Sequence, residues 1–123
     1  MAHEHLVHLT GTIIGCAIEV HKALGPGYAE RVYARALRLS FRQRGIPHTT
    51  EQAVRLEYLG QFIGRHRLDL VVADLIIVEL KAAPVLTRAH IAQLVSYLRS
   101  SKKPLGLLLN FSHAVLQIKR VVC

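Results

Sequence analysis

A length of 123 residues accommodates one domain with a hydrophobic core and is too short for two, so residues 1–123 are expected to form a single domain. The net charge of +8 favours a polyanionic partner such as nucleic acid. Two isolated cysteines, no apolar run long enough for a membrane span and no secretion signal at the start argue against a disulfide scaffold, a zinc knuckle and membrane contact, so we expect a cytoplasmic protein.

Two helices are predicted in the first 45 residues. Apolar residues recur at helical spacing from about Glu4 to Leu24, and Gly25-Pro26-Gly27 ends that helix. A second helix is predicted from about Tyr28 to Arg44, with an apolar side made of Tyr33, Leu37 and Phe41. One turn earlier, the same side begins with Glu30. An acid in the first turn of a helix complements the helix dipole, so this residue has a structural explanation as well as a functional one.

Arginines form a separate stripe on the second helix, at steps of four, three and four residues: Arg31, Arg35, Arg38 and Arg42. Such a stripe is typical of a solvated face, and it also suits a surface that contacts phosphate groups. Together with Arg67, these arginines are the candidate nucleic-acid-binding residues.

From Thr50 onward the sequence alternates in the way that is typical of strands. One strand ends in a turn at Leu59-Gly60-Gln61, a second is predicted from Phe62 to Val72, and a third continues to Lys81. The three strands are therefore expected to form a meander.

Three charged residues interrupt the second and third strands of this meander: Asp69, Glu79 and Lys81. Unpaired charges are costly to bury, so they need a reason to be there. A two-residue turn at Ala73-Asp74 would place Asp69 on the opposite face from Glu79. A three-residue loop centred on Asp74 instead pairs Asp69 with Glu79, Leu70 with Val78, Val72 with Ile76 and Leu68 with Leu80. We predict the odd-numbered loop, because it separates the apolar side chains from the charged ones.

Facing carboxylates of this kind repel each other and resist joint ionisation. A divalent cation such as magnesium or manganese would remove the conflict, since hard oxygen ligands suit these ions. Lys81 points to the same side, where an ammonium group can stabilise charge on a phosphate or orient a water molecule. The alternative is that Glu79 and Lys81 neutralise each other at a strand end, and the spacing alone leaves both interpretations open.

The last third of the chain is predicted to add one helix and two strands. Thr87 is the expected N-cap of a helix that continues to about Ser101, and Gln93 and Tyr97 lie on one line of it. As a pair they are common on ordinary exposed surfaces. Leu105 to Phe111 is predicted to be a fully buried strand, and Ala114 to Val122 an edge strand. The order of elements predicts an α/β fold with a mixed central sheet flanked by helices.

The segment Gly27-Tyr28-Ala29-Glu30-Arg31-Val32-Tyr33 resembles the GxxExxY signature of a family of small bacterial proteins. The resemblance covers nearly the whole chain, and its further motifs are Val20-His21, Leu24 to Gly27, the strand with Asp69, Ile77 to Ala82, Gln93 to Leu98 and Leu108-Leu109-Asn110-Phe111. That family is part of the PD-(D/E)XK, or restriction-endonuclease-like, superfamily. The resemblance implies the αβββαβ core of that superfamily, with an extra N-terminal helix.

The resemblance also implies roles for individual residues. Asp69 and Glu79 would bind Mg²⁺ or Mn²⁺, Glu30 would be an additional ligand, and Lys81 would stabilise charge or orient water. Gln93 and Tyr97 resemble a QxxxY helix motif that lies beside the active centre. Leu68 departs from the pattern, because the name of the superfamily implies proline there; this makes the motif less specific and leaves its chemistry unchanged.

Two functions follow from the resemblance and the residues together. The first is a metal-dependent nuclease that hydrolyses phosphodiester bonds, with DNA expected ahead of RNA. The second is a catalytically silent nucleic-acid-binding or regulatory module on the same fold. In either case a homodimer is one way for so small a domain to gain recognition surface. The presence of all four charged site residues favours the nuclease.

Overall fold

The structure, a computed structural model, describes residues 2–123. Within these residues the chain forms three helices and five strands, in the order α1 (Ala2–Leu24), α2 (Glu30–Gln43), β1 (His48–Tyr58), β2 (Gln61–Val72), β3 (Ile76–Lys81), α3 (Arg88–Ser101), β4 (Leu105–Asn110) and β5 (Gln117–Val121). The strands form one sheet in the order β1-β2-β3-β4-β5, in which β3 and β4 are parallel and the other neighbours antiparallel. The predicted α/β class, with a mixed sheet flanked by helices, is confirmed.

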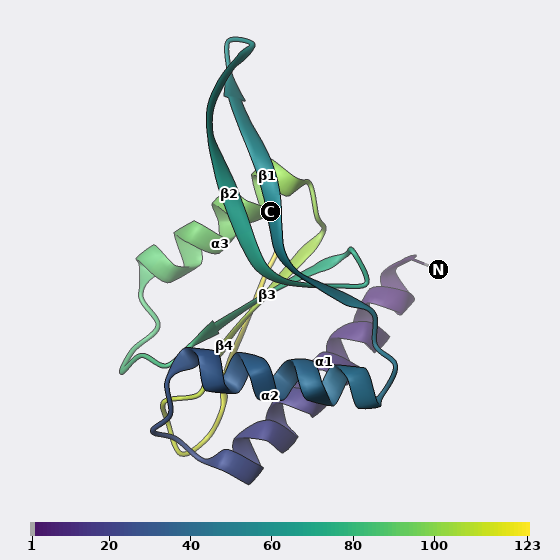
Figure 1. Cartoon of the computed structure of the whole chain (residues 1–123), viewed down its shortest axis with the longest axis vertical. Coiled ribbons are helices and arrows are strands. Elements are labelled where there is room, and N and C mark those ends of the chain that lie inside the picture. The colour runs from purple at the N-terminus through teal and green to yellow at the C-terminus, as the bar shows by residue number, and fades with distance from the viewer. Residues whose placement is uncertain (1) are drawn as a thin grey trace.

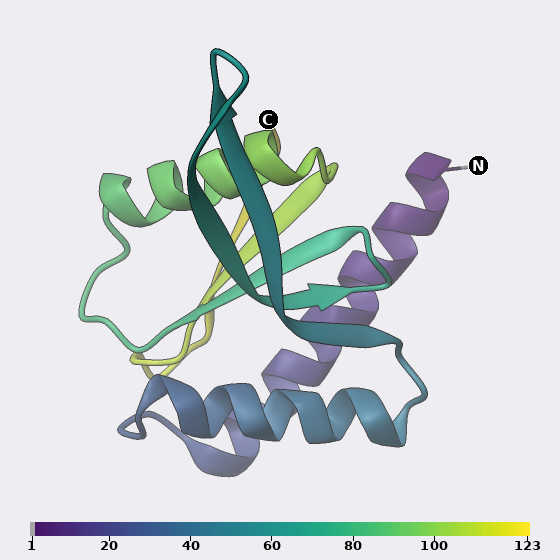
Figure 2. The ribbon, with the colours of Figure 1, turned by 45° about the horizontal axis from the view of Figure 1, so that its top comes forward.

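Helices cover the two faces of the sheet unequally, as Figure 2 shows: α1 and α2 lie on one side and α3 on the other. The larger core cluster joins α1 and α2 to alternate sheet residues such as Val78 and Leu107. The smaller cluster joins Leu94 and Leu98 of α3 to Ile77 and other residues of the opposite face. Because side chains alternate along a strand, β3 and β4 are buried on both faces and have nearly continuous apolar sequences.

Local sequence signals place most of the element ends. Thr87 caps α3 as predicted, since its hydroxyl accepts a hydrogen bond from the His90 backbone N–H at 3.2 Å. The apolar side of α2 is buried at Tyr33, Leu37 and Phe41, also as predicted. Two predicted starts were too early, because α2 begins at Glu30 and β5 begins at Gln117. None of the helices in residues 2–123 combines the length and the apolar character that crossing a membrane requires.

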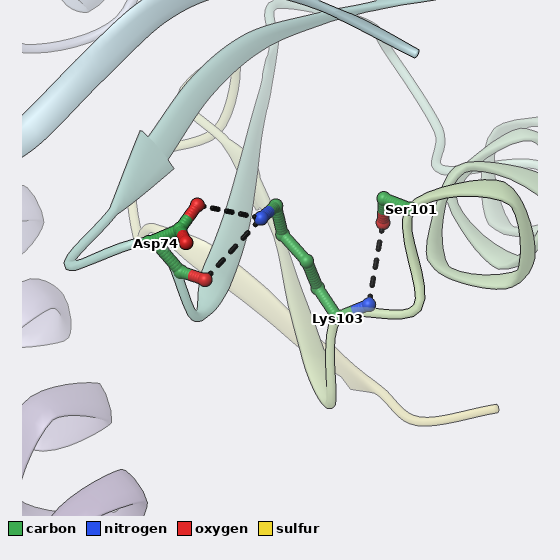
Figure 3. Close-up of polar contacts among 3 residues, drawn as sticks. All are labelled: Asp74, Ser101 and Lys103. Carbon is green, nitrogen blue, oxygen red and sulfur yellow. Dashed lines mark hydrogen bonds and ion pairs between the residues drawn. The ribbon is translucent and has the colours of Figure 1, made fainter. Parts of the chain in front are cut away.

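The turn between β2 and β3 has the odd length that the sequence predicted. Val72 pairs with Ile76, so the loop contains Ala73, Asp74 and Leu75 and is centred on Asp74. The Lys103 ammonium donates hydrogen bonds to the Asp74 carboxylate at 2.8 Å and to the Asp74 backbone oxygen at 3.2 Å (Figure 3). These bonds lower the pKa of the Asp74 carboxyl group and tie the turn to the loop after α3.

Beyond the turn, the predicted pairing is only partly right. The β2–β3 ladder ends at Val71 and Ile77, so the predicted ladder pairs of Asp69 with Glu79, Leu70 with Val78 and Leu68 with Leu80 do not form. The reason is that β2 turns away from β3 and follows β1 into a long two-stranded ribbon (Figure 1). The expectation that Leu68 and Leu80 share an apolar face is wrong as well, since Leu68 packs in the α3 cluster and Leu80 in the α1–α2 cluster.

Candidate active site

The buried carboxylate of Glu79 lies where β2 diverges from β3. The residue is only 6% exposed, and its Oε1 atom has no hydrogen-bond partner. The pKa of Glu79 is raised to about 7, first by burial and then by the negative charge of Asp69; Lys81 opposes this shift, and Glu30 adds to it. Three charged side chains from three elements therefore act on Glu79, although Asp69 is not its ladder partner.

The alternative of a simple strand-end ion pair does not describe this arrangement. Within residues 2–123 no salt bridge joins Lys81 to Glu79. An unpartnered carboxylate oxygen beside two further carboxylates is unfavourable unless a cation or a proton is added. The oxygen-rich donor set fits a hard divalent ion such as Mg²⁺ or Mn²⁺. In the described part of the chain, however, no three His, Cys, Asp or Glu residues form a ready metal-binding group.

Glu30 takes its position from the turn that starts α2. The buried Tyr33 hydroxyl donates a hydrogen bond to the Gly25 backbone oxygen at 2.5 Å and accepts one from the Tyr28 backbone N–H at 3.2 Å. The Tyr33 ring stacks on Phe111, with 4.5 Å between the ring centroids. The tyrosine of the Gly27–Tyr33 motif thus fastens the turn to the end of β4, and it determines where Glu30 begins the helix.

The segment after Lys81 is fastened in a similar way. The buried Asn110 side chain accepts a hydrogen bond from the Ala83 backbone N–H at 3.1 Å and donates one to the Ala83 oxygen at 2.8 Å. The Phe111 backbone N–H donates to the Lys81 oxygen at 2.9 Å. Figure 1 shows that β3 ends on the side of the molecule where α2 and α3 begin. Asn110 is therefore a positioning residue for the lysine strand end, a role that sequence reasoning missed.

Tyr97 approaches the carboxylates from α3. Partial burial, followed by the charges of Glu79 and Asp69, raises the pKa of the Tyr97 hydroxyl. Its ring packs on His66 with 4.7 Å between centroids, and His66 Nδ1 lies 2.8 Å from the Ser100 hydroxyl. Gln93, one turn earlier, is exposed, and its side chain has no hydrogen bond to any residue in the range 2–123. Of the QxxxY pair, the structure thus brings Tyr97 to the carboxylates; no sequence pattern indicated His66.

A cavity of about 360 Å³ opens between α2 and the base of the β1–β2 ribbon, next to the carboxylates. Its lining consists of Glu30, Arg31, Ala34, Arg38, Thr50, Glu51, Arg67, Asp69, Leu70 and Leu80. Three of the five candidate arginines are therefore beside Glu30 and Asp69, whereas Arg35 and Arg42 are exposed and do not line the cavity. Arg38 Nε is buried in this region without a hydrogen-bond partner.

Glu51 is a further acid in this cavity that sequence reasoning missed. It lies opposite Asp69 in the β1–β2 register, between the pairs Thr50–Leu70 and Gln52–Leu68. Its φ of 57° is unusual for a residue other than glycine, and its carboxylate forms an ion pair with Arg67. Extending the hairpin register back from the Leu59-Gly60 turn would have placed Glu51 opposite Leu68, one residue away from Asp69, because a bulge at Leu56 and Glu57 shifts the count.

Comparison with known proteins gives one match. A family model described as the PD-(D/E)XK nuclease superfamily matches residues 7–121. No curated protein and no solved structure matches the chain significantly. The matched range begins inside α1 and ends with β5, so it includes the acids, the lysine, the arginines and the α3 residues described above.

Proposed function

The chain belongs to the PD-(D/E)XK nuclease superfamily, and from that premise we propose that it is a metal-dependent nuclease that hydrolyses phosphodiester bonds, acting as a single domain of the GxxExxY subfamily. The main support is the unpartnered, buried Glu79 carboxylate, on which the charges of Asp69, Glu30 and Lys81 all act. A cluster of acids at the divergence of two strands, beside an open cavity, suits hydrolysis of a phosphodiester.

Asp69 and Glu79 would hold Mg²⁺ or Mn²⁺, with Glu30 as the third acid of the site. When bound, such an ion polarises a phosphoryl oxygen and stabilises the charge that develops on it. Because Mg²⁺ is usually held by one or two carboxylates together with water and substrate phosphate, the site does not need a ready group of three protein ligands. Glu79 has to lose its proton to act as a ligand, and its pKa of about 7 couples this step to neutral pH.

The other residues would act on the substrate directly or through their neighbours. The Lys81 ammonium would stabilise negative charge on the phosphate or orient the attacking water. Tyr97 and Gln93 would support the site from α3. Arg31, Arg38 and Arg67 would hold phosphates of the nucleic-acid strand that is cleaved. Arg35 and Arg42 would add only general electrostatic attraction from the outer side of α2.

The test is incubation of the protein with single-stranded and duplex DNA and with RNA, in the presence of Mg²⁺ or Mn²⁺. We expect cleavage, with DNA ahead of RNA, and we expect it to disappear in Lys81→Ala. Lys119→Ala, on the edge strand β5, is the matched control and should cleave like the parent protein. Cleavage that persists in Lys81→Ala would refute the assignment of the site.

The second candidate function is a catalytically silent nucleic-acid-binding or regulatory module, alone or as a homodimer. It is favoured by the lack of a ready three-residue metal group within residues 2–123. Calorimetry with Mn²⁺ separates the two candidates. The nuclease requires Mn²⁺ binding that Asp69→Ala abolishes, whereas equal heats for the two proteins would favour the silent module.

A further inference from the structure

The outer end of the β1–β2 ribbon stands clear of the rest of the molecule. β1 and β2 pair with each other from His48–Val72 out to Tyr58–Gln61, whereas β2 pairs with β3 only at its last two residues. Figure 1 shows the ribbon projecting past α3. The ribbon is nevertheless well formed, with a ladder that is interrupted only at Glu51 and at the bulge beside Leu56 and Glu57. A projecting element of this kind needs a reason, since an isolated hairpin has little stability of its own in water.

Apolar side chains gather at the ribbon tip, which is defined here as residues 55–65. Tyr58, Leu59, Phe62 and Ile63 are 66%, 82%, 43% and 63% exposed. The turn residues Leu59 and Gly60 have φ values of 51° and 76°. Two-residue hairpin turns with positive φ at both positions favour Asn, Asp or Gly at the first of them. Leucine is thus a poor choice for the turn itself, and its high exposure leaves this apolar side chain free to contact a partner.

Two arginines beside these residues face each other in the ladder. Arg55 and Arg65 are direct cross-strand partners, and their guanidinium carbons lie 4.6 and 4.7 Å from the centroid of the Phe62 ring. Like charges directly opposite each other destabilise a ladder. Arg55 has an acidic partner in Glu57 at 2.8 Å, but within residues 2–123 no acid pairs with Arg65. An external anion at the tip would remove the conflict.

From these features we infer that the ribbon tip binds in a groove of duplex nucleic acid, which makes duplexes the substrate class of the proposed nuclease. A two-stranded ribbon fits the major groove, which is about 12 Å wide. Arginines contact phosphates, and exposed apolar side chains contact base edges or wedge between base steps. Only the statement that duplexes are the substrate class rests on the proposed function, because binding of a duplex to the ribbon tip requires no cleavage.

The length of β2 allows one duplex to contact both the tip and the carboxylates. Phe62 and Asp69 are seven residues apart on β2, which corresponds to roughly 23 Å at 3.3 Å per residue. This span is shorter than one helical turn of a duplex, about 34 Å. A single strand that stacks on Phe62 and Tyr58 would need neither the ribbon width nor the leucine at the turn.

The inference is tested by the affinity for a short DNA duplex and for one of its separated strands, measured by fluorescence anisotropy in EDTA so that cleavage plays no part. The variants are Leu59→Asn, which suits the turn, and Arg65→Gln. We expect each to weaken duplex binding by at least about fivefold and single-strand binding by less than about twofold. Val115→Asn and Arg120→Gln remove an exposed apolar side chain and a charge outside the ribbon, and they should bind like the parent protein.

Three outcomes would overturn the inference: unchanged duplex binding by both tip variants, an equal loss of single-strand binding, or a change in sedimentation with duplex binding intact, which would make the tip an interface between copies of this chain. Thermal unfolding of each variant checks that the fold is retained. If the tip variants lose duplex binding and no cleavage is found with Mg²⁺ or Mn²⁺, the inference stands and the proposed function fails. If the tip variants still cleave duplexes like the parent protein, the proposed function stands and the inference fails.

Discussion

The two ends of β2 lie in different environments. At its inner end, Leu70, Val71 and Val72 are buried between helices on both faces. At its outer end, the strand has only β1 as a neighbour, and Phe62 and Ile63 are exposed. Asp69 lies at the change from one environment to the other. The difference shows why charged groups gather at this point: β4 pairs with Glu79 and Lys81 and holds them in place, and the diverging end of β2 leaves room for a ligand.

The largest effect is expected at the junction itself. Asp69→Asn removes one negative charge from an exposed position without changing the size of the side chain, so the fold should be retained. We expect cleavage to fall on the order of a thousandfold, as when a preorganised charge is removed from an active site. Glu4→Gln, which neutralises an exposed acid in α1 away from the junction and the ribbon, should cleave at the parent rate. Equal activity of Asp69→Asn and the parent protein would place the chemistry elsewhere.

The burial of Glu79 in the packed part of the sheet is tested by the pH dependence of stability. The pKa of Glu79 rises from 4.5 to about 7 on folding, so between these values the folded state binds more protons than the unfolded state. The contribution of Glu79 is therefore favourable below pH 4.5, declines as pH rises, and is lost above pH 7. In EDTA at pH 8, Glu79→Gln should raise the free energy of unfolding by at most about 3 kcal/mol, with no gain at pH 4.

Chemical denaturation of the parent protein and Glu79→Gln across this pH range measures the difference in their free energies of unfolding. Both proteins contain the same histidines, so the histidine contributions to the pH dependence cancel in this difference. Added Mn²⁺ should stabilise the parent protein at pH 8 and leave Glu79→Gln unchanged, since a neutral amide is a poor ligand for the ion. Identical pH profiles of the two proteins would mean that Glu79 is not desolvated in solution.

The close packing beneath the site is tested at Gly106 of β4. A Cβ atom there would come within 2.8 Å of the Leu94 side chain, so α3 approaches the sheet through the space that this glycine leaves. Gly106→Ala should lower the free energy of unfolding by about 2 kcal/mol and shift α3, which carries Gln93 and Tyr97. Gly15→Ala in α1 is the control: a Cβ atom meets nothing there within 4 Å, so stability should be unchanged or higher. Thermal unfolding measures both.

The smallest effect separates the two sides of the arginine stripe. The double variant of Arg31 and Arg38 to Gln removes two charges from the cavity, and the double variant of Arg35 and Arg42 to Gln removes two from the outer side of α2. General electrostatic attraction falls equally in both. We expect nucleic-acid affinity to fall about tenfold in the first and less than about threefold in the second. Equal losses would mean that the cavity holds no phosphate.

Patterns between near neighbours in the chain were enough to determine much of this protein. Helical spacing placed the buried side of α2, the hydroxyl of Thr87 placed the start of α3, and alternation around Asp74 determined the odd length of the β2–β3 turn. The acids and the lysine of the candidate site stood out because charge is costly in a buried strand. Periodicity and turn chemistry act over a few residues, so they can be assessed before the fold is known.

Only the tertiary structure decided where β2 leaves β3, because strand twist accumulates over the whole sheet. That divergence ended the predicted ladder before Asp69 and moved Leu68 to the α3 side. It also selected Arg31, Arg38 and Arg67 from five similar arginines to line the cavity. The same departure left the β1–β2 ribbon projecting, and the bulge at Leu56 and Glu57 set the register that pairs Arg55 with Arg65.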